Sequence, residues 1–300
     1  MSEETKVGTN PLKVLQSTID ASVNFVSQQA IGYFESRYVR RTPEYFIAYL
    51  SSQSGCNRGC QFCHLTTTGQ TLSIDANKWD FTQQADAVFK YYAQLGQPAK
   101  YVHYNFMARG EALANPHMLN EGPAILETLG SLAHHVYKLP AKFNVSTIMP
   151  VTLKKPLIDV FSYMNPTMYY SLYSVDGAFR KKWMPGAMDV DKALSMLHEY
   201  QKFNTKPVRI HFAMIEGEND SREDMEMITT AIKDHHLDVD FNIVRYNPGD
   251  DSSRETSEAA IFKNADYLRE LNETSTVQVV TRVGLDVHAS CGMFVDSEGV

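Results

Sequence analysis

Apolar positions along the chain follow two alternating patterns. Short runs rich in β-branched and aromatic residues predict strands, and longer stretches with apolar residues three or four apart predict helices. The expected strands are Phe46–Gln53, Tyr101–Phe106, Phe143–Thr147, Met168–Tyr173, Val208–Met214, Phe241–Tyr246 and Thr276–Val283. The helices expected between them are Phe81–Leu95, Met118–Tyr137, Leu153–Tyr163, Asp191–Phe203, Arg222–His235 and Glu258–Asn272. An earlier stretch, between Pro11 and Phe34, is also expected to be helical.

The regular alternation of strand and helix indicates an α/β protein with parallel strands joined by right-handed crossovers. A doubly wound sheet and a barrel both satisfy this pattern. We expect a helical N-terminal extension over residues 1–45, an α/β body over residues 46–275 and a C-terminal segment over residues 276–300. The polar run Asn247–Ser257 predicts a mobile surface loop, because its Pro, Gly, Asp and Ser residues favour turns.

Composition narrows the class of partner and the compartment. The 35 acidic side chains outnumber the 28 basic ones, so an extensive phosphate-binding surface is not expected, although a local basic patch is compatible with the count. No apolar run approaches the length of a membrane span, and the first ten residues lack a signal-peptide hydrophobic region. Three of the four cysteines lie within eight positions, which is not typical of a disulfide framework. We therefore expect a cytoplasmic, reducing location and no membrane association.

The three clustered cysteines, Cys56, Cys60 and Cys63, follow the first predicted strand on a glycine-rich loop. Three thiolates on one short loop can hold three irons of a cubane cluster and leave the fourth iron open to a chelating ligand. A structural zinc site, with His64 or Cys291 as its fourth ligand, is an alternative, but zinc motifs usually consist of pairs of close ligands. Unligated core thiols are the other alternative. The pattern favours a [4Fe–4S] cluster.

The spacing of these cysteines resembles that of the radical SAM superfamily. This resemblance implies that S-adenosylmethionine (SAM) chelates the open iron and is cleaved there. It also implies that Gly110 and Glu111, which follow the second predicted strand, receive the amino group of SAM.

More narrowly, the chain resembles the RNA adenine methyltransferases of this superfamily, which act on carbon 2 or carbon 8 of adenine in RNA. The similarity runs from about Glu35 to Phe294. The matching pieces are Ser51–Gln53, Gly55–Cys56, Met107–Glu111, Ser146–Thr147, Ser171–Tyr173, Asn219–Asp220, Asn247–Pro248 and Ala289–Gly292. The resemblance implies a partial parallel (β/α)₆ barrel and ribosomal or transfer RNA as partner. We further expect a monomer and an electron donor such as flavodoxin or ferredoxin.

The resemblance also assigns roles to individual residues. The SAM contacts it implies are Gly110, Glu111, Ser146, Ser171, Leu172, Tyr173 and Asn247. Cys291 matches the cysteine that first takes a methyl group from one SAM. A radical from a second SAM then removes a hydrogen atom from that S-methyl group, and the resulting carbon radical adds to the adenine ring. A buried structural cysteine and a fourth cluster ligand are the alternatives for Cys291.

Two features limit how far the family's properties transfer. Tyr49 stands where the family has a second cysteine that releases the product by disulfide formation. Glu35 lies near a family glutamate proposed as proton acceptor, so a catalytic role is one hypothesis and a solvated charge the other. The stretch Arg180–Trp183 is the first candidate for RNA contact, with basic side chains for phosphate and Trp183 for stacking on a base. A solvated helix start is the alternative for this stretch. The remaining alternatives are a diverged radical SAM enzyme with another substrate and a non-catalytic iron–sulfur or zinc module.

Overall fold

One ten-stranded sheet organises the chain in the computed structural model, which describes residues 12–296. Residues 1–11 of the expected N-terminal extension and residues 297–300 of the expected C-terminal segment lie outside the described residues. The strands are β1 Lys13–Gln16, β2 Val23–Gln28, β3 Tyr33–Thr42, β4 Tyr45–Tyr49, β5 Tyr101–Phe106, β6 Ala141–Thr147, β7 Thr167–Tyr170, β8 Val208–Ala213, β9 Val239–Val244 and β10 Val277–Val279.

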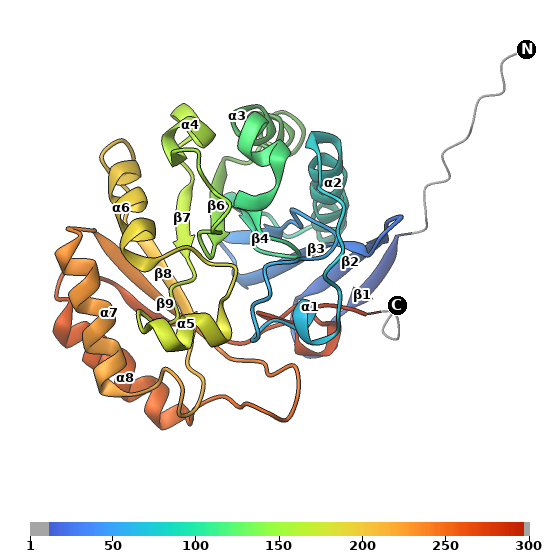
Figure 1. The fold of residues 1–300 in the computed structure, drawn as a ribbon. Helices are drawn as coiled ribbons and strands as arrows, with labels where there is room; N and C mark the ends of the chain where they lie inside the picture. The colour runs from blue at the N-terminus through green and yellow to red at the C-terminus, as the bar shows by residue number, and fades with distance from the viewer. Residues whose placement is uncertain (1–11, 297–300) are drawn as a thin grey trace, which may run out of the picture.

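The strands from β4 to β10 are parallel and follow one another in chain order, as the alternating sequence pattern predicts. The helices are α1 His64–Thr67, α2 Lys78–Leu95, α3 Pro116–Ser131, α4 Leu157–Phe161, α5 Gly177–Trp183, α6 Val190–Gln201, α7 Arg222–Asp234 and α8 Glu258–Leu271. Six of them, α2, α3, α4, α6, α7 and α8, lie along the outer side of the strands (Figure 1). The α/β fold class with a parallel sheet is therefore confirmed. Strand order is linear, and no pairing within residues 12–296 joins β10 to β1, in keeping with a partial barrel.

The predicted helix between Pro11 and Phe34 is wrong. Residues 13–42 instead form β1, β2 and β3, which pair antiparallel and extend the sheet beyond β4. Two local features favour strands here. Val23–Gln28 and Tyr33–Thr42 are rich in β-branched and aromatic residues, and Gly32 adopts a φ of +69° at the turn between them. The expected helical N-terminal extension is thus an antiparallel addition to the same sheet.

Alternating side chains of each parallel strand pack in opposite directions. Phe46, Val102 and Tyr104 are fully buried and belong to the hydrophobic core with residues of the covering helices, such as Phe81 and Phe89. The other face of these strands is turned inward, to the hollow of the partial barrel. None of the helices within residues 12–296 is long and apolar enough to span a bilayer.

Two short helices complete the set: α1 was not expected from the sequence, and α5 lies where a helix start was one alternative. Both follow the carboxyl ends of strands, where the connections carry the residues with candidate chemistry. The polar run Asn247–Ser257 connects β9 to α8 without a helix or a regular strand.

Candidate active site

The cysteine loop is folded tightly against the segment that follows it in the chain. The Cys56 N–H donates to the Gln70 carbonyl at 3.1 Å. A Cβ on Gly55 would lie 2.3 Å from the Leu72 carbonyl oxygen, so only glycine fits at this point. Gly59, with a φ of +72°, supplies a turn that other residues rarely adopt. The loop therefore brings Cys56 and Cys63, which are seven positions apart, to one side of one cavity.

That cavity has a volume of about 290 Å³ and is lined by the strand ends and by Cys56, Cys60, Cys63 and Cys291. Burial raises the pKa of the Cys56 thiol to about 12 and that of Cys63 to about 11, and it raises the pKa of Cys60 as well. Buried thiols in this setting ionise when a metal supplies positive charge. No group of three His, Cys, Asp or Glu side chains within residues 12–296 is close enough together to hold a single metal ion. Three soft sulfur donors around a roomy cavity suit an iron–sulfur cluster, which is larger than one ion.

The Gly110–Glu111 pair lies beyond the end of β5 and lines the same cavity. Gly110 adopts a φ of +89°, and a Cβ there would lie 2.6 Å from the backbone nitrogen of Gln53. The Glu111 carboxylate accepts the Leu113 N–H at 3.1 Å and the Ile148 N–H at 3.0 Å. Burial raises its pKa, although these hydrogen bonds act in the opposite direction. The carboxylate is thus held in place at the wall of the cavity.

Of the other expected SAM contacts, Ser146, Ser171 and Tyr173 line the cavity. Tyr173 adopts a φ of +57°, and its ring stacks on Phe62 with centroids 4.0 Å apart and planes 8° apart. This stack covers the loop between Cys60 and Cys63.

Leu172 and Asn247 lie outside the cavity lining. Leu172 is fully buried in the core. The Asn247 side-chain amide donates to Ser290 Oγ at 3.1 Å and to the Cys291 carbonyl at 2.8 Å. In this arrangement Asn247 positions the segment that carries Cys291.

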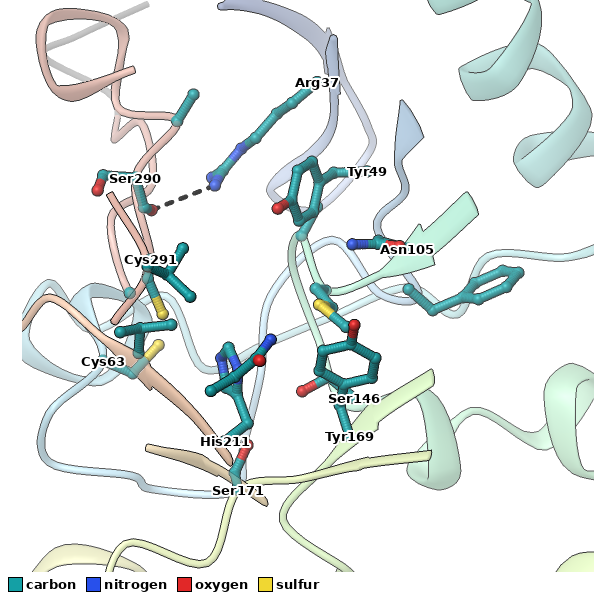
Figure 2. A pocket seen from close by; sticks show the side chains of 18 of the residues that line it. Arg37, Tyr49, Cys63, Asn105, Ser146, Tyr169, Ser171, His211, Ser290 and Cys291 are labelled. Carbon is teal, nitrogen blue, oxygen red and sulfur yellow. Dashed lines mark hydrogen bonds between the residues drawn. The ribbon is translucent and has the colours of Figure 1, made fainter. Parts of the chain in front are cut away.

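Cys291 lies on a C-terminal segment that folds back over the cavity. Its side chain is open to the cavity, and both it and Cys63 point into the same pocket (Figure 2). The His64 N–H donates to the Gly292 carbonyl at 3.0 Å, which ties this segment directly to the cysteine loop. Burial raises the pKa of the Cys291 thiol, and the positive charges of Arg37 and Arg41 act against that shift.

A buried ion network holds the same C-terminal segment from the other side. Glu35 is fully buried and pairs with Arg109 at 2.6 Å and with Arg37 at 3.0 Å. Its Oε1 also accepts the Val295 N–H at 3.0 Å. Arg37 donates to the Met293 carbonyl at 2.7 Å and to the carbonyl of Ser290, as the dashed line in Figure 2 shows.

These contacts favour a structural role for Glu35 over the catalytic role that the sequence suggested. Glu35 does not line the cavity, and both of its oxygens are occupied by hydrogen bonds. Burial alone would raise its pKa, but Arg37 and Arg109 lower it below the ordinary value. These contacts are those of a residue that positions its neighbours. Sequence analysis did not identify either arginine, because the residues around an arginine do not show which distant carboxylate it will pair with.

Two further expectations meet the structure here. Tyr49 lines the cavity, at the position where the family carries its second cysteine.

The stretch suggested for RNA contact is largely engaged within the protein. Arg180 is buried and donates to the carbonyls of Leu172 and Met188, and the Trp183 indole is buried and donates to Glu218. The expectation that Arg180 grips phosphate and Trp183 stacks a base is therefore wrong, because both side chains are used to build the fold.

Sequence analysis also did not identify a set of polar residues on the inner faces of the strands as part of the site. His103, Asn105, Tyr169, His211 and Asn242 all line the cavity. Their signal was available as polar residues at every second position of otherwise apolar strands, which marks one face of each strand as non-core.

Comparison with known proteins agrees with this geometry. The family model described as the Radical SAM superfamily matches residues 50–228, which is more than half of the chain. The chain belongs to the radical SAM superfamily. Membership implies a [4Fe–4S] cluster and SAM as cofactors, as the cysteine spacing predicts.

Two relatives narrow the comparison within the superfamily. The chain is 27% identical over 253 residues to the ribosomal RNA large subunit methyltransferase Cfr of Staphylococcus warneri, covering 81% of this chain and 67% of that protein. It is 26% identical over 264 residues to a probable dual-specificity RNA methyltransferase RlmN of Chlorobaculum tepidum, covering 83% of this chain and 64% of that protein. The resemblance to RNA methyltransferases is thereby confirmed, over about two thirds of the relatives' length.

Among solved structures, a radical SAM methyltransferase from Sphaerobacter thermophilus superimposes with a TM-score of 0.76. It is 19% identical and covers 95% of this chain and 81% of that one. This likeness shows the fold.

The Gly110–Glu111 turn yields a first testable prediction for this radical SAM protein. Gly110→Ala should weaken SAM binding on the order of tenfold to hundredfold, because the added Cβ displaces the turn from Gln53. Gly96→Ala is the matched control, since Gly96 has a φ of +61° but open space around it. Both variants share a backbone strain of about 1–2 kcal/mol. Equilibrium binding of SAM to reconstituted protein distinguishes them, and equal affinity in the two variants would contradict the placement.

The ion network yields a second prediction. Glu35→Gln should destabilise the fold by about 3–5 kcal/mol, because it leaves two buried guanidinium groups without their counter-charge. Since the folded-state pKa of Glu35 is lowered, its stabilisation is complete above the ordinary value of 4.5 and is lost as pH falls through the folded-state pKa. The difference in urea stability between wild type and Glu35→Gln should therefore be constant near neutral pH and shrink under acid conditions.

Glu44→Gln serves as the control, because Glu44 pairs with Lys100 on the exposed surface. It should lose little stability. An equal, pH-independent loss of stability in both variants would contradict the prediction that the buried network stabilises the fold more than an exposed ion pair does.

Proposed function

We propose that this chain is a radical SAM methyltransferase that methylates an sp² carbon, that of adenine in RNA, through a methyl group carried on Cys291. The observation that carries the proposal is that Cys291 opens into the same cavity as the three cluster cysteines and the Gly110–Glu111 turn. A thiol so placed can meet both the methyl donor and a substrate that enters the cavity.

The residues present suit the two cofactors that the superfamily uses. Cys56, Cys60 and Cys63 would hold the cluster. Gly110 and Glu111 would receive the amino group of SAM, with Ser146, Ser171 and Tyr173 around it and with Leu172 and Asn247 behind. When bound and reduced, the cluster supplies the electron that cleaves SAM at its sulfonium.

Cys291 would act first as a nucleophile. Its sulfur would form a bond to the SAM methyl carbon as the methyl–sulfonium bond breaks. S-adenosylhomocysteine would leave as the neutral thioether, and the thiol proton would pass to solvent in the open cavity. An aromatic C–H carbon is too weak a nucleophile to take that methyl group directly, so a carrier thiol beside a radical source meets the need. Asn247 and Arg37 hold the backbone of the carrier on both sides.

RNA as the substrate is supported by the relatives, whose names describe action on RNA. The net charge of −7 limits the basic surface, but Arg41 and Arg58 line the cavity and contact only neutral oxygens among residues 12–296. Arg37, Arg245 and Arg282 line the cavity as well, but each of these pairs with a carboxylate.

Tyr49 favours a second candidate function, a radical SAM enzyme with the same carrier thiol but another substrate or ending. The chain has four cysteines, of which three belong to the cluster loop and the fourth is Cys291. A phenol cannot form a disulfide with a methyl carrier. Product release would need an external thiol, or a general base that frees the product without thiol exchange.

Anaerobic reconstitution tests the cofactor half of the proposal. The purified chain should bind about four irons and four sulfides and form 5′-deoxyadenosine from SAM when supplied with a reductant. Cys56→Ala, Cys60→Ala and Cys63→Ala should each lose both properties, whereas Cys291→Ala should retain the cluster. Tightly bound zinc with no 5′-deoxyadenosine would refute the proposal in favour of a metal-binding module.

Mass spectrometry tests the carrier. In protein isolated from cells that assemble the cluster, the peptide containing Cys291 should be heavier by one methylene group, and the peptides containing Cys56, Cys60 and Cys63 should be unmodified. An unmodified Cys291, together with loss of the cluster in Cys291→Ala, would identify it as a cluster ligand instead.

A further inference from the structure

The hollow of the partial barrel is lined by polar side chains. The register places polar residues at inward positions of neighbouring strands: Tyr49 pairs along the ladder with Asn105, and His211 pairs with Asn242. Interiors of parallel barrels are usually filled by bulky branched apolar residues, which pack as a core. A polar interior that borders a cavity is instead typical of a binding pocket.

Hydrogen bonds within the hollow leave specific groups unpaired. The Asn144 side-chain amide donates to Asn105 Oδ1 at 2.7 Å and approaches His103 Nδ1 at 3.1 Å. Asn105 therefore keeps its own amide N–H groups for the cavity it lines. Among residues 12–296, the buried His211 Nδ1 and Asn242 Oδ1 have no hydrogen-bond partner. Both atoms are shielded from solvent, although their side chains line the cavity. Buried polar atoms are rarely left unpaired, and rotation of the amide and of the imidazole would offer these two atoms to a ligand in the cavity.

The hollow is neutral where these groups lie. Burial lowers the pKa of His211 and of His103 to about 4, so both rings are uncharged near neutral pH. Arg209 pairs with Asp240 at 3.0 Å, which removes another charge from the inner face. An uncharged ligand group is therefore preferred here over a charged one, whose burial would be costly.

Aromatic rings complete this part of the wall. Tyr169 meets His211 edge to face, with centroids 5.9 Å apart, and Tyr49 lies nearby on β4 (Figure 2). A flat ligand can stack or pack against such rings. Exposed Arg41, at the end of β3, lines the same cavity and reaches toward the Thr281 carbonyl beside β10. The open side of the sheet thus carries a cation that can bind an anionic group, such as a phosphate, linked to the flat ligand.

We infer that His211 and Asn242 recognise the polar edge of an uncharged heteroaromatic ring, a nucleobase, that enters the hollow facing Cys291. With the Asn242 amide rotated so that its oxygen faces the cavity, that oxygen accepts a ring N–H or exocyclic amino hydrogen, and the His211 imidazole bonds a second edge atom. The phosphate that follows the base stays near Arg41. A base read in this way has to leave its stacked position, as nucleic-acid enzymes commonly require. The inference rests on the proposed function and names the residues that select its substrate.

The test uses the reconstituted holoenzyme with SAM and two RNA hairpins that differ only in one loop position, adenosine in one and an abasic site in the other. Wild type should bind the adenosine hairpin at least about tenfold more tightly than the abasic one. In His211→Phe and in Asn242→Leu this preference should shrink to near unity. His211→Gln, which keeps a hydrogen-bonding group, should restore part of it.

His198→Phe is the matched control, because His198 also has an unpaired buried Nδ1 but lies on α6 outside the cavity lining. It should keep the full preference. A variant that is merely damaged weakens both hairpins alike, so the ratio separates recognition from folding.

Equal binding of the two hairpins by wild type, or an unchanged ratio in both variants, would overturn the inference. So would the absence of binding to either hairpin and to adenosine monophosphate. Formation of 5′-deoxyadenosine is measured in parallel. Its absence would refute the proposed function itself, whereas its presence with equal hairpin affinities would refute only the roles of His211 and Asn242.

Discussion

The ion network around Glu35 is the interaction on which the arrangement of the site depends. One fully buried carboxylate joins Arg37 from β3 with Arg109 from the turn after β5, and both arginines bind the backbone of the C-terminal segment. Removing one partner of such a network leaves uncompensated charge in a low-dielectric interior. The C-terminal segment has little regular structure of its own, so its path over the cavity is set by these polar contacts.

That path determines what chemistry the cavity can support. The cysteine loop, the Gly110–Glu111 turn and Cys291 come from three distant parts of the chain, yet all line one cavity. Parallel strands explain the first two, because their carboxyl ends meet at one rim. The third needs the network and Asn247, which hold Cys291 across the mouth of the barrel. Together they combine a radical source with a carrier thiol, as the proposed function requires.

The interior of the barrel adds a second level of organisation. Inward positions of the strands carry polar groups, and outward positions carry the apolar residues that pack under the helices. A single sheet thereby separates the core that stabilises the fold from the pocket that selects a ligand. Tyr49 lies in that pocket, so the residue that departs from the RNA methyltransferase family sits where it can affect the end of the reaction.

Local pattern in the sequence determined the parallel strands, most helices and the cysteine loop, because periodicity, glycine and thiol spacing act over a few residues. The helix expected between Pro11 and Phe34 was wrong: local runs of β-branched and aromatic residues favour strands there, and pairing from β2 through β3 to β4 fixes them in the sheet. Arg180 and Trp183 were candidates for RNA contact, although tertiary contacts bury both. The partners of Glu35 and the position of Cys291 were decided only by the tertiary structure. Charges more than seventy residues apart meet through the fold, and nothing in either local sequence encodes that meeting.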